Sequence, residues 1–300
     1  MAGELAPFHG QHKAMIERFG TPWFVSPDGS DQTTRGKSYK RPLLTLDEAI
    51  DRAASDDRII LAPGDYTGPF TIPVGKPRLT LIGDGPRGSV FLGITGAATV
   101  LTNNADRTRL ENISLEGDET ALSVGLLNRG KGLRYKVGRI LNVATSAKFT
   151  MGTPTEVTAG TYGDGSDTLC EDVEFSWGTD GVELIGVTDL VDVGDFPTTQ
   201  NYFRHCRFHN LSNSAFKETP GGGAAQSFRD LEVEDCTFRR IEAGTEPTYY
   251  MKLDGSNSNT GIVTRCSFPT ALAGGKNLVS TGLIWVSNFH TGGISTTVPS

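Results

Sequence analysis

Long apolar runs are missing from this sequence. The first 20 residues, MAGELAPFHGQHKAMIERFG, lack the apolar stretch of a secretory signal peptide, and no later segment is long enough to span a bilayer. We therefore expect synthesis in a cytoplasm, without a signal peptide and without insertion into a membrane. The 28 basic residues are scattered through a chain of net charge −7, so no basic patch predicts a nucleic-acid partner.

Cysteine is scarce, and its spacing does not fit a zinc site. Four cysteines occur and none forms a CxxC pair. His205 and His209 bracket Cys206, but alternation along a strand sends His205 and Cys206 to opposite sides. A cytoplasmic origin disfavours disulfides. We expect Cys206, Cys236 and Cys266 to be free thiols stacked in the interior, where cysteine behaves as a small hydrophobe.

These three cysteines each begin a Cys-x-Phe tripeptide, and the tripeptides recur at intervals of 30 residues. A fixed period of this size indicates a structural unit that stacks on the next copy of itself. The apolar positions in each tripeptide are two residues apart, which is strand spacing. The pattern therefore predicts a coil of parallel strands in which equivalent residues lie above one another.

Strand anchors with the same surroundings extend the repeat over most of the chain. Successive anchors are 25, 35, 33, 30 and 30 residues apart: Leu115, Ile140, Phe175, Phe208, Phe238 and Phe268. Unequal steps between similar strands predict loops of different length on a regular core. Residues 151–168 and 186–200 are the longest irregular pieces and are candidate functional loops.

The N-terminal part has a different pattern. Residues 11–19 predict a short helix, and residues 23–25 predict a strand. Thr45 is placed to cap a helix that runs to about Ser55, with Glu48 completing a capping box. A strand at residues 59–61 and a turn at residues 63–65 follow.

The order VSPDGSD, TLDEAIDRA and IILAPGDY resembles the opening of the pectin lyase-like right-handed parallel β-helix proteins. That superfamily includes polysaccharide lyases, polygalacturonases, epimerases, and the tailspikes and other particle-surface proteins of tailed bacteriophages. The resemblance covers residues 21–75 by motif and the remainder by repeat pattern. It implies an all-β fold, a single-stranded right-handed parallel β-helix (solenoid) with an N-terminal capping helix. The expected parts are a docking segment at 1–20, a capping strand and helix at 21–58, coils at 59–290 and a tail at 291–300.

The second strand of each coil is expected to align one outward column of side chains: Ser123, Lys148, Glu183, Lys217 and Lys252. Asp180, in a turn GTDG, lies near this column with Glu218 and Asp254. Glycosidases need two carboxyl groups, and lyases need a base with charge neutralisation, often by calcium. If the chain is an enzyme, the catalytic candidates are Asp180, Glu183, Glu218 and Lys217. The alternative is that these charges pair across coils and only keep the surface soluble.

Aromatic residues near the same column are candidates for stacking on sugars. Trp177, Tyr249 and Tyr250 supply rings, and Lys252 and Asp254 supply polar groups for carbohydrate binding. Tyr249 and Tyr250 are adjacent, so they should point to opposite faces. Packing in the core is the alternative role for each ring.

Two functions remain open on the sequence. No GHG motif occurs, and Asp56-Asp57 lies in the capping segment, so the polygalacturonase pattern is not matched. The first hypothesis is a structural component of a tailed-bacteriophage virion: a homotrimeric spike or decoration on head or tail, at the virion surface. It would be attached to other phage capsid or tail proteins by its N-terminal segment and would contact host-surface glycans. The second hypothesis is a lyase or glycoside hydrolase that depolymerises capsule or exopolysaccharide. The first needs no cofactor or metal, and the second needs Ca²⁺ if it is a lyase.

Overall fold

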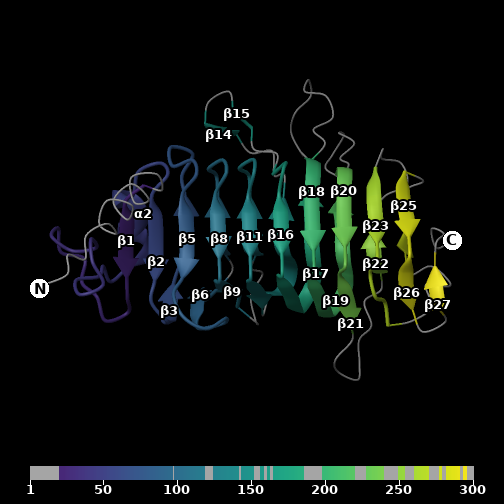
Figure 1. The fold of residues 1–300 in the computed structure, drawn as a ribbon, viewed down its shortest axis with the longest axis horizontal. Helices are drawn as coiled ribbons and strands as arrows, with labels where there is room; N and C mark the ends of the chain where they lie inside the picture. Colours follow the sequence, from purple (N-terminus) through teal and green to yellow (C-terminus); the bar gives the residue numbers. More distant parts are fainter. Residues whose placement is uncertain are drawn as a thin grey trace, which may run out of the picture.

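The chain folds into an elongated coil of strands (Figure 1). The structure is a computed structural model, and it describes residues 20–96, 98–118, 124–141, 143–151, 156–158, 161–162, 165–185, 198–219, 228–239, 249–253, 260–269, 277–278, 282–290 and 293–295. The helix expected at 11–19 lies outside these residues. No helix in the described ranges is long and apolar enough to cross a membrane.

The first face of the coil is a parallel sheet that runs along its whole length (Figure 1). Each strand pairs with the strand one coil earlier and one coil later, as a solenoid requires. In spatial order the strands are β1 (Pro22–Val25), β2 (Arg58–Leu61), β5 (Thr80–Gly83), β8 (Arg109–Glu111), β11 (Arg134–Lys136), β16 (Leu169–Glu171), β18 (Thr198–Arg204), β20 (Phe228–Glu234), β23 (Gly261–Thr264) and β25 (Leu283–Val286).

A second sheet provides the other two faces, because two of its strands are long and belong to both. The second face contains β3 (Gly64–Thr67), β6 (Val90–Gly93), β9 (Ser114–Glu116), β12 (Arg139–Leu141) and β21 (Thr237–Arg239). The third face contains β4 (Phe70–Ile72), β7 (Thr99–Asn103), β10 (Val124–Asn128), β13 (Val143–Met151), β22 (Tyr249–Lys252) and β24 (Asn277–Leu278). The long strands β17 (Glu174–Ile185) and β19 (Arg207–Thr219) pair with strands of both faces.

Two small antiparallel pairs complete the strands. They are β14 (Glu156–Thr158) with β15 (Thr161–Tyr162), and β26 (Asn288–His290) with β27 (Gly293–Ser295). The first pair lies in the predicted loop at 151–168. The second predicted loop, 186–200, is described only from Thr198, where β18 begins.

The capping helix predicted after Thr45 is present as α2 (Leu46–Arg52). The Thr45 hydroxyl accepts a hydrogen bond from the backbone N–H of Glu48, so the predicted N-cap is confirmed. Leu46, Ala49 and Ile50 are buried, and the helix contacts β1, β2 and β4. It ends before the predicted Ser55 because Ala53 is already in an extended conformation. The turn predicted at 63–65 is also too long, since β3 begins at Gly64.

The predicted anchor residues form one inward column on the second face. The register pairs Leu115 with Ile140, Ile140 with Phe175, Phe175 with Phe208 and Phe208 with Phe238. The four phenylalanine rings are stacked, with 4.8, 5.1 and 4.6 Å between successive centroids from Phe175 to Phe268. The predicted stacking of equivalent residues is therefore confirmed.

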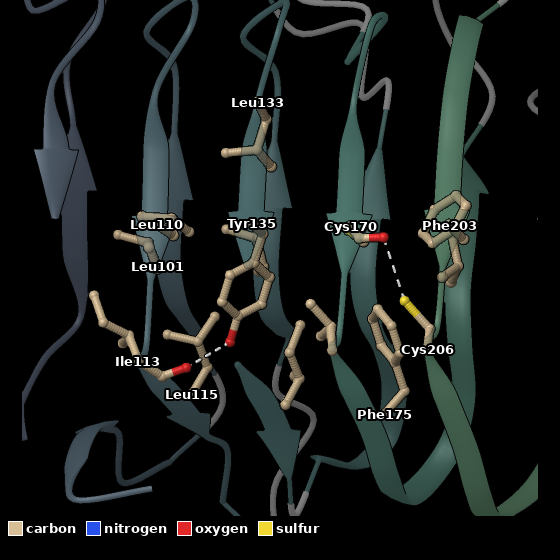
Figure 2. Close-up of a cluster of buried hydrophobic side chains, with 14 of the residues drawn as sticks. Leu101, Leu110, Ile113, Leu115, Leu133, Tyr135, Cys170, Phe175, Phe203 and Cys206 are labelled. Atoms are coloured by element: carbon tan, nitrogen blue, oxygen red, sulfur yellow. Dashed lines mark hydrogen bonds between the residues drawn. The ribbon is translucent and has the colours of Figure 1, made fainter. Parts of the chain in front are cut away.

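The cysteine stack occupies the corner between the first and second faces. Residues in the left-handed conformation turn the chain here, and three of them, His205, Asp235 and Arg265, directly precede the cysteines. Cys206, Cys236 and Cys266 are free and buried, as is Cys170 in β16. The Cys206 thiol lies 3.4 Å from the Cys170 carbonyl oxygen, in the same core where the Tyr135 hydroxyl contacts the Ile113 carbonyl (Figure 2). The prediction of buried free thiols is confirmed.

Candidate functional site

Part of the predicted outward column lies in one row on the third face. Parallel pairing of β17, β19 and β22 places Glu183 opposite Lys217, and Lys217 opposite Lys252. The row continues toward the N-terminus through Thr150 of β13 and Leu127 of β10. The backbone therefore brings one carboxylate and two ammonium-bearing residues to neighbouring positions on three successive coils.

Lys148 is not in this row. The register of β13 and β17 shifts between Val143 and Ala147, after which Thr150, and not Lys148, pairs with Glu183. A single irregularity moves every later residue relative to its neighbours. The predicted alignment of Lys148 with Glu183 was therefore wrong, and Ser123 lies outside the described residues.

Asp180 is buried, although the sequence suggested an exposed turn. It lies within β17, near a register shift between Gly178 and Asp180, and its exposed fraction is 2%. The Ser214 hydroxyl donates a hydrogen bond to one carboxylate oxygen. The Lys217 ammonium lies 3.2 Å from the other oxygen and remains partly exposed. Asp180 therefore holds the Lys217 side chain at the surface, and it offers little access to a substrate.

The remaining predicted site residues are placed only in part. For five of them the structure describes the backbone but not the side chain. These are Trp177 and Glu183 in β17, Glu218 in β19, and Tyr249 and Lys252 in β22. Asp254 lies wholly outside it. The register pairs Glu218 with Leu184, one position beyond the pair of Glu183 and Lys217.

Tyr250 lies in the interior. Its exposed fraction is 1%, and its ring packs edge-on against Phe238 and Phe268, at centroid distances of 5.9 and 5.4 Å. A ring in this position cannot stack on a sugar. Of the two adjacent tyrosines, only Tyr249 remains a candidate for that role.

The sequence reasoning missed a charged cluster on the second face, centred on Glu174 of β17. One Glu174 oxygen lies 3.0 Å from Nε2 of His209, and the other lies 3.5 Å from Nε of Arg139 and 4.0 Å from Arg207. Glu174 and His209 are largely buried. The hydrogen bond to His209, with the charges of Arg139 and Arg207, lowers the pKa of Glu174 to about 2.

Glu174 and His209 line a small cavity of ≈ 240 Å³, together with Arg207, Phe208 and Arg239. A signal for this cluster exists in the sequence. Arg139, Glu174 and Arg207 each directly precede a strand anchor, so stacked coils place them in one column. A carboxylate held between two guanidinium groups is fixed in its ionised form, so Glu174 cannot serve as a general acid near neutral pH.

The described residues do not fit a calcium site. Nowhere among them do three or more Asp, Glu, His or Cys side chains come together in a group that could hold a metal ion. Calcium needs six to eight oxygen ligands, several of them carboxylates. The described side chains therefore do not support a calcium-assisted lyase step.

Comparison by sequence finds no matching protein family, and no curated protein matches. Comparison by structure finds similar folds. Pectate lyase Pel9A has a TM-score of 0.62 at 14% identity, over 90% of this chain and 68% of its own. Escherichia coli YbhC has a TM-score of 0.58 at 13% identity, over 97% and 87%. The pectin methylesterase of Aspergillus niger has a TM-score of 0.55 at 15% identity, over 94% and 89%.

These likenesses extend over almost the whole chain, but the identities are low. They show a pectin lyase-like right-handed parallel β-helix, in agreement with the pairing of strands on the three faces. At this identity the fold is shown and an activity is not.

Proposed function

We propose that this chain, a right-handed parallel β-helix of the pectin lyase-like type, is a surface component of a tailed-bacteriophage particle that binds host-surface glycans without cleaving them. The single observation that carries the non-catalytic part is the state of Asp180. This candidate catalytic carboxylate is 2% exposed and is already paired with Ser214 and Lys217.

Glycan binding is supported by the proteins whose solved structures have a similar fold. The similar structures include a pectate lyase and pectin methylesterases, and one of the latter was solved in complex with a hexasaccharide. In addition, Glu183, Lys217 and Lys252 occupy one row of the third face. A row of charged positions along the axis offers repeated hydrogen-bonding positions to an extended polymer.

The absence of cleavage is supported by the electrostatics of two described carboxylates of β17, Glu174 on the second face and Asp180. A glycosidase acid needs a raised pKa. The pKa of Glu174 is instead lowered to about 2. The carboxylate of Asp180 is already paired with the ammonium group of Lys217. Burial and Asp51 raise the pKa of Asp47, but that residue belongs to the capping helix.

The viral part of the proposal rests on the sequence resemblance. The opening of the chain resembles that of the pectin lyase-like β-helix proteins, a superfamily that includes tailspikes and other particle-surface proteins of tailed phages. In this proposal three copies assemble along their faces, and the N-terminal segment attaches them to the particle. Symmetric assembly of this kind repeats one binding surface three times around an axis.

The alternative is a capsule or exopolysaccharide depolymerase. It is favoured by one observation, the opposite positions of Glu183 on β17 and Lys217 on β19. A base and an acid at those positions would suffice for a lyase or a glycosidase.

Incubation with surface polysaccharide separates the two functions. Purified protein is mixed with polysaccharide from candidate hosts, and reducing ends and the absorbance of unsaturated uronates are followed. We expect binding and no product. Product formed by the wild type and by Glu232→Gln on the first face, but abolished in Glu183→Gln, would establish the depolymerase and overturn the proposal.

A further inference from the structure

An open groove of ≈ 560 Å³ lies on the outer side of the first face. Its lining comes from β2, β5, β8 and β11, which lie side by side in Figure 1, and from the turns that precede these strands. Five arginines line it: Arg58, Arg78, Arg107, Arg109 and Arg134. Three carboxylates accompany them: Asp56, Glu111 and Asp167. The groove is thus rich in arginine on a chain whose net charge is −7.

The repeat itself places the arginines along the axis. One column comes from outward strand positions, since the register pairs Arg58 with Thr80, Thr80 with Arg109, and Arg109 with Arg134. A second column comes from the left-handed residues two positions before each strand: Asp56, Arg78, Arg107 and Gly132. Neighbouring parallel strands are about 4.8 Å apart, so the two columns form a strip that is about 14 Å long between β2 and β11.

Two of the arginines are already neutralised by partners on adjacent coils. Arg78 forms a two-point ion pair with Asp56, and the Arg134 guanidinium lies 3.0 Å from Asp167. These pairs sit at the two ends of the strip. Of the three carboxylates named above, Glu111 alone is outside these pairs, and it lies two residues from Arg109 on β8. One carboxylate therefore remains beside the two guanidinium groups of Arg107 and Arg109.

The middle of the groove holds Arg107 and Arg109. Both are exposed, and within the described part of the chain neither guanidinium makes an ion pair or a hydrogen bond. Both side chains line the same groove, so their like charges repel across it, and an anion bound between them lowers the energy of the site. Each guanidinium can bind a carboxylate or a sulfate by donating two parallel hydrogen bonds to its oxygens.

Gly132 keeps the space beside Arg107 open. Its φ of +75° is one that side chains rarely adopt, and a Cβ there would stand 3.1 Å from Cγ of Arg107. The position also faces the Asp167 carboxylate at 3.5 Å. The column of side chains is therefore interrupted beside Arg107.

We propose that this groove binds a linear acidic polysaccharide, one that carries carboxylate or sulfate groups at regular intervals, lying parallel to the solenoid axis. The inference rests on the proposed function, because it names the class of glycan and adds a second surface to the third face. A repeating ligand fits a repeating row of donors, and Arg107 and Arg109 bind its acidic groups directly.

A nucleic acid fits the groove less well. Single strands bind through aromatic side chains on which bases stack, and none of the described residues that line this groove is aromatic. Duplexes need an extended basic surface, whereas this strip contains three carboxylates and covers four strands.

The test is calorimetric titration of the full chain with polygalacturonate oligosaccharides, dextran sulfate, neutral dextran and an oligothymidylate. The variant is Arg107→Gln/Arg109→Gln, which breaks no ion pair among the described residues. The control is Arg229→Gln, which removes an exposed charge from the far end of the same face and breaks no ion pair among the described residues. Circular dichroism establishes that each variant is folded.

We expect the wild type and the control to bind one or both acidic polymers, with affinity that falls as salt rises, and not to bind dextran. The Arg107/Arg109 variant should lose about tenfold or more in affinity. Comparison of the affinity for polygalacturonate with the affinity for dextran sulfate shows whether the groove binds carboxylate or sulfate groups.

Equal affinity of the variant and the wild type for the acidic polymers would overturn the proposal that this groove binds them. So would tighter binding of the oligothymidylate, or equal binding of neutral dextran. Acidic-polymer binding that is unchanged in the variant, with a wild type that does bind host polysaccharide, would overturn this inference alone. Loss of acidic-polymer binding in the variant, with no binding of any host glycan by the wild type, would instead overturn the proposed function and leave the groove standing.

Discussion

Glu174 illustrates how the repeat acts on a single residue. Its carboxylate receives Arg139 from the preceding coil and Arg207 and His209 from the following coil. None of these partners is close in sequence. Each arrives because its own strand anchor stacks on Phe175, so packing of the interior places the charges outside it.

This environment predicts a pH-dependent contribution of Glu174 to stability. A carboxylate whose pKa falls from 4.5 to about 2 on folding stabilises the folded state above pH 4.5 and loses that effect as the pH falls toward 2. Glu174→Gln should lower the free energy of unfolding at pH 7 by about 1–3 kcal/mol, the value of a hydrogen bond to a charged group. Urea unfolding at several pH values measures it.

The control for Glu174 is Glu232→Gln, which breaks a more exposed pair with Arg204. It should cost less than about 1 kcal/mol. A Glu174 variant as stable as the wild type at pH 7, or a difference that grows below pH 4.5, would contradict the assignment.

For single residues, the sequence predicted the positions of inward side chains better than those of outward side chains. The cysteines and phenylalanines were placed correctly because their identity repeats with the period. Asp180 and Lys148 were misplaced because alternation breaks near register shifts, at Gly178–Asp180 and Val143–Ala147. The residue types at 143–147 do not mark an irregular backbone, and the glycines at 178 and 181 indicate a turn and not a shifted strand. In both places the shift arises in the pairing with neighbouring coils.

Among the elements, the strands of the second face depend most on the aromatic column. Phe175, Phe208, Phe238 and Phe268 stack with planes within 4–10° of parallel. Phe208 and Phe238 each stack on the rings of the preceding and the following coil, so the column connects one coil to the next. In a solenoid such contacts between neighbouring units supply much of the stability.

Removal of one ring from the middle of the column should therefore destabilise several coils. Phe238→Ala is expected to cost about 3–5 kcal/mol, because a buried ring is replaced by a cavity. Phe289→Ala, at a ring that is 46% exposed, is the matched control and should cost far less. Denaturant midpoints of both variants measure the difference, and equal midpoints would show that the column does not carry the stability.

The existence of the elements could be predicted from the sequence, but some of their boundaries could not. Thr45 and the apolar stripe of Leu46, Ala49 and Ile50 predict α2, yet the extended Ala53 ends it early. The strands expected on either side of residues 178–181 are one strand, β17, that turns the corner between two faces. A glycine-containing segment reads as a turn, and only its pairing with β13 and β19 keeps it in the sheet.

The whole molecule presents two charged surfaces on one rigid coil. The third face carries the row of Glu183, Lys217 and Lys252, and the first face carries the arginine groove. Both run along the axis because equivalent residues stack. The fold was predictable from the period of the repeat, whereas the groove was not, since its arginines come from positions that the repeat leaves variable.

Assembly is predicted at the same scale. Light scattering of the purified chain should give a mass three times that of the 32.1 kDa protomer. A monomer at micromolar concentration would contradict the trimeric arrangement, although it would leave the coil and its surfaces unchanged.

The central claim, binding of a glycan without cleavage, is tested most directly by chromatography with light scattering on a mixture of protein and host polysaccharide after long incubation. The account predicts that the protein elutes with the polymer and that the molar mass of the polymer itself is unchanged. A polymer that becomes shorter, or a protein that elutes as if the polymer were absent, would contradict it.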